Sequence, residues 1–388
     1  MKITFCRKLI GIAFIMFFLV QVKSHSQYAI MFSDADSLVR EGSDRIYNCQ
    51  FDQAHSLFQK VIQIYPYHPA GYFLDAMVEW WKMTVQYNNK KNPEFERRIE
   101  KVITLCDKVL DTNRLDLNAL FFKAGALGYR GRYYVNDKSW FSAASDAKEA
   151  FNILLQILEK APGNHDAMLG TGTYNYFAQK FPEEYPLLQP IMTFLPRGDK
   201  QMGLLQLHAS ATYARYAATE AKVLLQQIYY QFEKDYSKAL QISEELFKKY
   251  PDNPYFHRYY GRCLVVMGDF DKMEQTWRDA LMNYINKKPY YDKFTAREAL
   301  YYIGYALMKK RQFDMALKYF YKCDEASRLL DQDPSGFMVR LNLNVGNIYD
   351  LQGKRNLAVS QYKKILKFKE YDNSHTEAEY YLKKPYGR

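Results

Sequence analysis

Histidine is the residue type in this chain with the widest range of possible chemistry, because it can bind metals and transfer protons near neutral pH. None of the histidines belongs to an HExxH motif or lies at metal-ligand spacing from a cysteine. The chain also lacks a GxSxG motif and a Walker phosphate loop. We therefore predict no metal site and no cofactor. The seven histidines are His25, His55, His68, His165, His208, His257 and His375.

Two short patterns resemble parts of a catalytic or phosphate-binding signature. Glu183 and Glu184 form an acid pair, but adjacent carboxylates in a proline-flanked turn are usually solvated. Gly170 and Gly172 occur in the sequence LGTGTYNY, which lacks the third glycine of GxGxxG and a preceding strand. We interpret these two glycines as close-packing positions of a helix. With no catalytic pattern found, we predict that the protein is not an enzyme.

Four cysteines follow the apolar stretch near the start of the chain: Cys49, Cys106, Cys263 and Cys323. An oxidising compartment would allow them to form disulfides. They contain no CxxC pair, and their wide separation places them on different structural repeats. We expect them to be small buried hydrophobic residues.

Residues 1–26 have the pattern of a secretory signal peptide. Three basic residues precede a twelve-residue apolar run from Leu9 to Val20, which is too short to cross a bilayer. Ser24 and Ser26 supply the small side chains expected before a cleavage site. The pattern predicts export to the periplasm or the outside of a bacterial envelope, with an uncleaved signal anchor as the alternative. No later apolar stretch approaches membrane-spanning length.

Composition favours a helical chain with a large core. Apolar residues make up 48% of the 388 residues and charged residues 25%, while glycine and proline are scarce. The net charge is +11, and beyond the leader the basic excess lies entirely in residues 201–388. This asymmetry indicates an acidic partner or an anionic surface, although an ordinary solvated helix face would give the same count. Export disfavours nucleic acid as the partner.

One pattern recurs in the C-terminal half. In each copy a glycine is followed, sixteen residues later, by a large aromatic residue, with an alanine or methionine four residues before that aromatic. Residues four apart share one face of a helix, so we expect these positions to pack one helix closely on the next. The copies are Gly261, Met273 and Trp277; Gly304, Ala316 and Phe320; and Gly346, Ala358 and Tyr362.

These spacings resemble the tetratricopeptide repeat, a helix pair of about 34 residues. The resemblance implies an all-α fold, a right-handed α-solenoid of about eight antiparallel helix pairs that must stack to bury their apolar faces. We predict the pairs at residues 34–48 with 51–64, 69–87 with 93–110, 116–132 with 140–160, 164–178 with 199–211, 217–232 with 235–249, 254–267 with 270–285, 294–310 with 312–330, and 336–351 with 354–370.

Two middle segments, residues 125–151 and 169–207, are similar to a bacterial exported tetratricopeptide group related to eukaryotic inclusion-body-clearance proteins. That resemblance implies a scaffold. In the first segment Gly125, Gly128 and Gly131 recur every three residues, which predicts one smooth ridge for close packing.

We predict one solenoid over residues 27–388, with divergent repeats at 27–198 and more regular repeats at 199–388. A proline-rich insertion at 178–198 interrupts the divergent part. It is either packed core, which we favour, or a lid or apolar docking site.

The resemblance also implies where a partner binds, because positions 2, 5, 9, 12 and 13 of the first helix of each pair line the concave groove of tetratricopeptide arrays. Arginine can fork onto a carboxylate, and tyrosine gives rigid apolar contact, so the residues at these positions suit an extended peptide. The predicted groove residues are Tyr255, Arg258, Arg262, Tyr301, Tyr305, Lys309, Arg340 and Asn347.

Together these features predict an exported, non-enzymatic scaffold that binds a protein or peptide partner, an acidic one being favoured, through a basic and aromatic groove. The alternative hypothesis is a ligand-binding periplasmic component of a transport system. It would hold an apolar or acidic small molecule between helices, with the proline-rich insertion as its lid.

Overall fold

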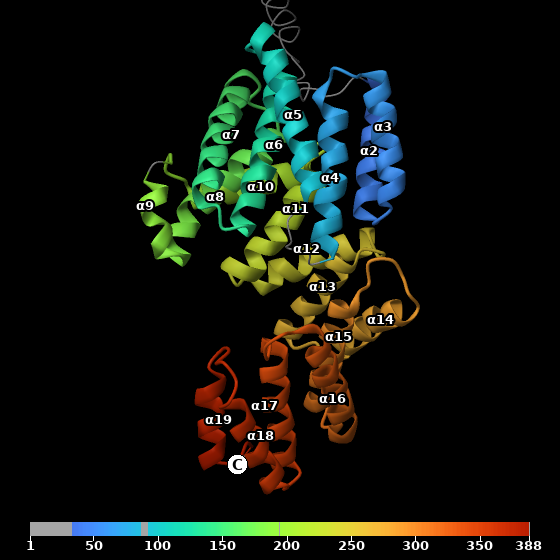
Figure 1. Ribbon diagram of the computed structural model, residues 1–388, viewed down its shortest axis with the longest axis vertical. Helices are drawn as coiled ribbons and strands as arrows, with labels where there is room; N and C mark the ends of the chain where they lie inside the picture. Colours follow the sequence, from blue (N-terminus) through green and yellow to red (C-terminus); the bar gives the residue numbers. More distant parts are fainter. Residues whose placement is uncertain (1–32, 87–91, 194, 388) are drawn as a thin grey trace, which may run out of the picture. The chain divides into compact units, whose positions relative to one another are not determined.

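The computed structural model describes residues 33–86, 92–193 and 195–387, and within these ranges every regular element is a helix (Figure 1). The predicted all-α class is confirmed. The leader predicted over residues 1–26 lies outside the described residues. The longer helices are α2 (Ser33–Tyr47), α3 (Phe51–Ile64), α4 (Pro69–Val85), α5 (Pro93–Thr112), α6 (Leu117–Asn136), α7 (Trp140–Lys160), α8 (Ala167–Glu184), α10 (Lys200–Tyr213), α11 (Ala218–Gln227), α12 (Tyr236–Lys249), α13 (Pro254–Met267), α14 (Phe270–Ile285), α15 (Lys293–Lys309), α16 (Phe313–Leu330), α17 (Gly336–Leu351), α18 (Arg355–Ile365) and α19 (Ser374–Lys383). The shorter elements are the 3-10 turn η1 (Pro186–Leu188), α9 (Gln189–Met192) and the π-helical turn η2 (Ile228–Phe232).

Short polar side chains set where many helices begin. In each of these caps an aspartate, asparagine or serine accepts a hydrogen bond from a backbone N–H of the first turn, which would otherwise lack a partner. The capping residues are Asp116, Asp199, Asp235, Asn253, Asp269, Asp292 and Ser335. At the other end of α13, Gly268 has a φ of 73° and stops the helix. Local sequence therefore divides the chain into helices of repeat length.

Consecutive helices pack against one another in pairs, which is an α-solenoid arrangement. A helix occurs at every predicted position. Five of the predicted pairs pack together: α6 with α7, α8 with α10, α13 with α14, α15 with α16, and α17 with α18. Two helix ends differ clearly from the prediction. Helix α8 continues through Pro182 to Glu184, beyond its predicted end at 178, and α18 ends at Ile365, before its predicted end at 370. Helix α19 was not predicted; it packs on α18 and α17.

The chain divides into two compact units, and neither is one continuous stretch. Among the described residues, unit 1 comprises those of 33–40, 58–74 and 96–221. Unit 2 comprises residues 41–57, 75–95 and 222–388. The N-terminal segments therefore contribute to both units, and each unit has its own packing.

In unit 1, glycines bring helices α8 and α10 close together. A Cβ added at Gly172 would lie 2.9 Å from the carbonyl oxygen of Gly203, and one added at Gly170 would lie 2.3 Å from Leu154 Cδ1. The close-packing role predicted for both glycines is confirmed. The predicted glycine ridge is wrong at Gly128, because a Cβ there would meet no atom within 4 Å.

The proline-rich segment of unit 1 is irregular and partly exposed. After α8 the chain forms η1 and then α9, each less than two turns long. The side chain of Leu187 is 93% exposed, and Tyr185 is also exposed. Leu187 is therefore not part of a packed core, and the core interpretation of the insertion is wrong at this residue.

A buried carboxylate joins the start of α2 to the residues that precede α11, all within unit 1. The Arg215 guanidinium donates two hydrogen bonds to Asp36, of 2.8 and 2.7 Å, and the Tyr216 hydroxyl donates a third of 2.7 Å. The hydrogen bonds from Arg215 lower the pKa of Asp36 from 3.8 to about 2. Asp36 is therefore ionised at neutral pH and links residues 179 positions apart.

In unit 2, the three repeated glycines lie against the three repeated aromatic rings. A Cβ added at Gly261 would lie 2.7 Å from the Trp277 ring, and one added at Gly346 would lie 2.5 Å from the Tyr362 ring. At Gly304 the distance to the Phe320 ring would be 3.0 Å. Each glycine thus lets the first helix of a pair sit directly on the aromatic residue of the second. This repeated contact is the packing that the tetratricopeptide resemblance implies.

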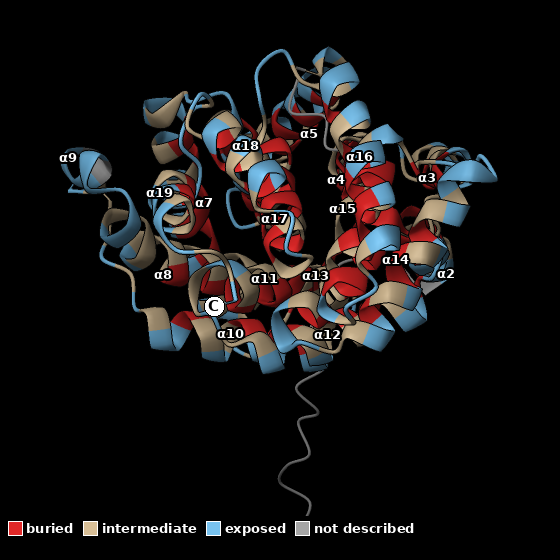
Figure 2. Ribbon diagram, turned by 90° about the horizontal axis from the view of Figure 1, so that it is seen from below, coloured by how far each residue is buried: buried red, intermediate tan, exposed pale blue. Residues whose placement is uncertain are grey.

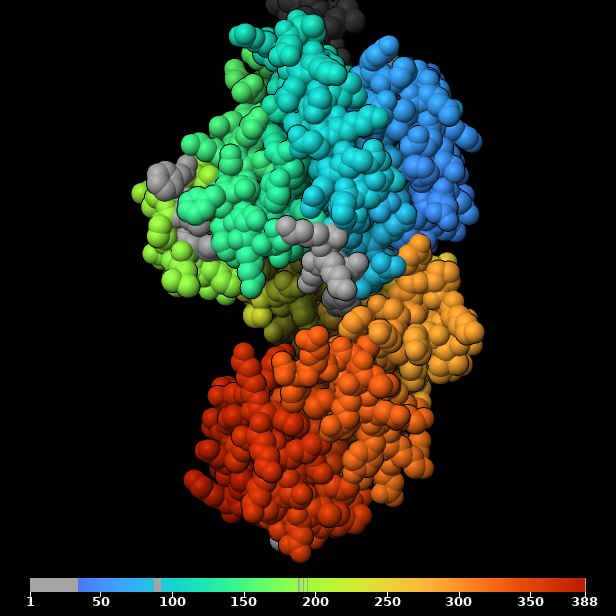
Figure 3. All heavy atoms as spheres, in the orientation of Figure 1, coloured from blue at the N-terminus to red at the C-terminus, as the bar shows by residue number. Residues whose placement is uncertain are grey.

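The core of unit 2 is continuous from α13 to α17. Its buried members include Leu264 on α13, Trp277 on α14, Ile303 on α15, Phe320 on α16 and Val345 on α17. Buried residues occupy most of α15 and α17 (Figure 2). In the space-filling view the atoms of α15 to α19 form one unbroken surface (Figure 3). Helices α15 and α17 are thus held by packing along most of their length.

Unit 2 also contains contacts between repeats that are not neighbours in the sequence. The ring of Trp81 on α4 lies 5.2 Å from that of Tyr47 and 5.7 Å from that of Phe256 on α13. The Tyr250 ring lies 5.3 Å from that of Tyr47, and the Asn253 amide donates to the Tyr47 carbonyl at 2.9 Å. A simple solenoid contact scheme, in which each pair touches only the next, is therefore incomplete here.

Candidate partner-binding face of α13, α15 and α17

The predicted groove residues all lie in unit 2, on the first helices of three successive pairs: α13, α15 and α17. Three of them are buried and bonded inside the unit. Arg258 is fully buried, and it donates to the Thr295 hydroxyl at 2.7 Å and to the Val85 carbonyl at 3.0 Å. Arg258 therefore joins α13 to α15 and α4, and a partner at the surface does not reach its guanidinium.

Tyr255 and Asn347 are buried in the same way. The Tyr255 hydroxyl accepts a hydrogen bond from the Gln227 amide, and its ring lies edge-on to Trp81 at 5.9 Å. The amide oxygen of Asn347 accepts from the Tyr362 hydroxyl at 3.0 Å. Both side chains have an internal role in this structure, and neither presents its polar group to solvent.

The half-buried arginines of the face are each paired with a carboxylate from one repeat further on. Arg262 forms a two-pronged pair with Glu298, with an Nη2–Oε2 distance of 2.8 Å. Arg340 donates to Glu377 at 2.7 Å. Both carboxylates lie one repeat length along the chain from their arginine. The positive charge that the sequence places here is therefore countered from within the protein.

One side of α15 carries three predicted groove residues that are four positions apart: Tyr301, Tyr305 and Lys309. The rings of Tyr301 and Tyr305 are nearly parallel, at 11°, with centroids 6.5 Å apart. The Tyr301 hydroxyl accepts from the Asn344 amide at 3.3 Å, and burial raises its pKa above the usual value. Lys309 is exposed, and its Nζ lies 5.1 Å from the centroid of the Tyr305 ring. Tyr305 is half-buried and Lys309 is exposed, so a ring and a cation of this row are accessible to solvent.

The carboxylates that lie on or beside this face were not predicted from the sequence. Glu298 and Asp350 are buried on α15 and α17, and Glu377 lies on α19, outside any predicted helix. Their signal in the sequence is a spacing: Glu298 follows Arg262 by 36 residues, and Glu377 follows Arg340 by 37. A search for opposite charges one repeat apart would have found both pairs.

The remaining metal-binding and nucleophilic side chains of the described ranges show no metal site and no activated thiol. No cluster of His, Cys, Asp and Glu side chains within them is arranged to hold a metal ion. Burial raises the thiol pKa of Cys106 and Cys323 to about 12 and that of Cys263 to about 11. These thiols are therefore protonated at neutral pH and poor nucleophiles. None of the helices that the structure describes is long and apolar enough to cross a membrane.

Comparison with known proteins gives distant structural likenesses. No family model matches the chain, and no curated protein matches it. A chain of the APC/C hetero-tetramer Cut9-Hcn1 is 14% identical, with a TM-score of 0.49; the match covers 86% of this chain and 52% of that one. This chain thus spans about half the length of that neighbour.

Two other solved structures match at similar levels. Yeast Tom70 is 12% identical with a TM-score of 0.38, and the match covers 87% of this chain and 86% of that one. The Rap protein complexed with competence and sporulation factor is 12% identical with a TM-score of 0.44, covering 91% and 97%. These neighbours are tetratricopeptide-repeat proteins. The repeated glycine and aromatic contacts give unit 2 a tetratricopeptide-like packing.

Proposed function

We propose that this protein is an exported, non-enzymatic scaffold of a bacterial envelope, of the exported tetratricopeptide kind that the middle segments resemble. It binds a protein or peptide partner through the face formed by α13, α15 and α17. The observation that carries this proposal is the row on α15. Tyr305 and Lys309 reach the surface from a helix whose other faces are fixed by buried contacts.

Rigid placement favours binding because the side chains lose little freedom when a partner arrives. Gly304 allows α15 to pack directly on the Phe320 ring. Two ion pairs fix the first turns of α15: Arg262 of α13 pairs with Glu298, and Arg297 pairs with Asp331. Tyrosine supplies a large contact area with few rotatable bonds. The face is therefore pre-organised for an extended peptide segment.

The charges define the partner further. Since Arg262 and Arg340 are already paired, Lys309 is the predicted groove cation left to meet a carboxylate of the partner. We propose a partner segment with one acidic group beside an apolar or aromatic one. A highly acidic segment would have to compete with Glu298 and Glu377 for their arginines.

Export rests on the leader pattern of residues 1–26. We expect the chain to be recovered from the envelope fraction of its source cells, shortened by the leader. Replacing residues 9–20 by a polar sequence should retain the protein in the cytoplasm at full length. Recovery of the full-length wild-type chain from the cytoplasm would contradict export.

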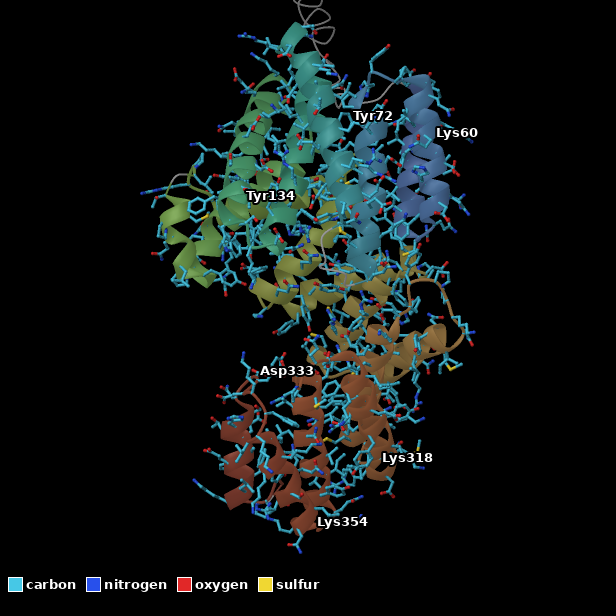
Figure 4. All side chains as sticks on the ribbon, in the orientation of Figure 1. Lys60, Tyr72, Tyr134, Lys318, Asp333 and Lys354 are labelled. Carbon is cyan, nitrogen blue, oxygen red and sulfur yellow. The ribbon has the colours of Figure 1, made fainter. Side chains whose placement is uncertain are left out.

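The partner-binding proposal is tested by paired variants. We expect the double variant Tyr305→Ala and Lys309→Glu to lose its co-purifying partner at least about tenfold, because it removes the ring and reverses the charge. The matched control is Lys318→Glu, an exposed lysine on the neighbouring helix α16 (Figure 4). Equal partner recovery by wild type, double variant and control would contradict the proposal.

A further inference from the structure

The segment that follows α19 lies against the end of α17 in the manner of a bound peptide. The backbone N–H of Tyr386 donates to Asp350 Oδ2 at 2.9 Å. The Tyr386 ring meets the Tyr381 ring edge-on, with centroids 5.2 Å apart, and it packs against the core cluster shared by α13 to α17. A backbone group and a ring of this segment therefore each have a defined place.

Gly387 completes the fit. Its φ is +79°, a conformation that L side chains rarely adopt. A Cβ added there would lie 2.8 Å from Leu351 Cδ2. The positive φ therefore favours glycine at this point, while the Leu351 side chain could turn aside for a methyl group. Recognition of the segment is selective at two successive positions, tyrosine and then glycine.

We call the surface that contacts this segment the seat; it consists of Asp350, Leu351 and Tyr381. Its α17 residues lie at repeat positions that correspond to the proposed partner-binding face. Leu351 follows Gly346 by five residues, as Lys309 follows Gly304. Asp350 stands one residue earlier and is buried. Leu351 is therefore the counterpart, on α17, of a predicted groove residue on α15.

The seat does not need the segment in order to persist. Asp350 also accepts hydrogen bonds from the Arg355 guanidinium, at 3.0 Å, and from the Tyr362 hydroxyl, at 2.9 Å. Arg355 in turn donates to the carbonyls of Tyr381 and Leu382 at the end of α19. If residues 384–387 leave, the carboxylate keeps its charge partner and α19 keeps its contacts with α18.

We propose that this seat, formed by Asp350, Leu351 and Tyr381, is a peptide-binding subsite, occupied in this structure by residues 384–387 of the chain itself. Its ligand is an extended segment with a tyrosine followed by glycine, which donates its tyrosine N–H to Asp350. A partner carrying such a segment displaces residues 384–387. The proposal rests on the proposed function, because it extends the partner-binding face from α15 to α17.

The test uses a fluorescein-labelled peptide of the sequence KKPYGR, which copies residues 383–388. Its binding is measured by fluorescence anisotropy to the full chain and to a chain that ends at Lys383. We expect the shortened chain to bind the peptide at least about tenfold more tightly, because its seat is empty. Equal binding, or no binding, by the two chains would overturn the proposal.

Variants of the full chain test the subsite even if the shortened chain misfolds. Gly387→Ala should loosen the segment because alanine is strained at a φ of +79°, and so should raise peptide binding toward the level of the shortened chain. The control Lys384→Ala changes an exposed side chain beside the seat and should leave binding at the wild-type level. Peptides KKPAGR and KKPYAR should each bind about tenfold more weakly than KKPYGR. If Gly387→Ala behaves as wild type while circular dichroism shows it folded, the subsite is wrong.

The two proposals fail separately. Suppose that the double variant Tyr305→Ala and Lys309→Glu loses the partner, but neither the full nor the shortened chain binds KKPYGR. The partner-binding face is then supported and the subsite is not. A chain that binds KKPYGR after shortening, yet keeps its partner in the α15 variant, has the subsite without the proposed α15 contact.

Discussion

His257 shows how a residue type associated with catalysis becomes part of the core. Its Nε2 lies 2.9 Å from the Thr276 carbonyl oxygen, which only accepts, so this nitrogen carries the proton. Its Nδ1 accepts from the Tyr291 hydroxyl at 2.9 Å. The ring is buried beside that of Phe247. Burial lowers the pKa of His257 from 6.5 to about 4, so the ring is neutral near pH 7.

This neutral histidine makes stability depend on pH in one window. The unfolded chain binds a proton at His257 below about pH 6.5, whereas the folded chain does so only below about pH 4. The contribution is therefore complete above pH 6.5 and is lost as the pH falls from 6.5 to 4, by about 3 kcal/mol in all. We expect the stability difference between wild type and His257→Gln to shrink by about this amount.

Urea denaturation at pH 7.5 and pH 4.5 measures that difference. The control Gly128→Ala, inside α6, changes no titratable group and should keep a nearly constant difference from wild type. A His257→Gln difference that is the same at both pH values would contradict a buried, neutral His257.

At the scale of the helix pair, the glycine and aromatic contacts of unit 2 carry the packing. We expect Gly304→Ala to lower the free energy of unfolding by about 1 to 3 kcal/mol, because the new methyl group would lie 3.0 Å from the Phe320 ring. The matched control is Gly128→Ala inside α6, where a Cβ meets no atom within 4 Å. It should be neutral or stabilising by about 0.5 to 1 kcal/mol, since alanine is the better helix former.

Chemical denaturation of the two variants beside wild type checks this prediction. If Gly304→Ala is as stable as Gly128→Ala, the close contact between α15 and α16 is not part of the folded protein in solution.

The sequence predicts the helix pairs of this chain well, because caps and glycine offsets are local signals. Asp269 and Asp292 begin α14 and α15 at the places where the pattern expects them. Helix α19 escapes prediction because residues 374–383 contain no glycine, so the repeated glycine offset is absent from them. Helix α8 passes through Pro182 because the chain resumes hydrogen bonding beyond it, as the bond from Tyr185 N to the Phe181 carbonyl shows.

The burial of the predicted groove side chains could not be predicted from the repeat. Spacing places Arg258 and Asn347 on the expected helices, but it does not show what covers them. Arg258 is covered because α4 packs on α13 within unit 2, through a contact between residues 173 positions apart. Tetratricopeptide offsets describe neighbouring pairs only, so they hold no signal for such contacts.

At the scale of the whole molecule, the central claim is that a partner binds the face of α15 that carries Tyr305 and Lys309. Site-specific photo-cross-linking in the source cells tests it most directly, with the photoreactive residue at position 309 in one chain and at position 318 in another. We predict a discrete protein adduct from position 309 and none of that mass from position 318. The same adducts from both positions, or an adduct from position 318 alone, would contradict the account.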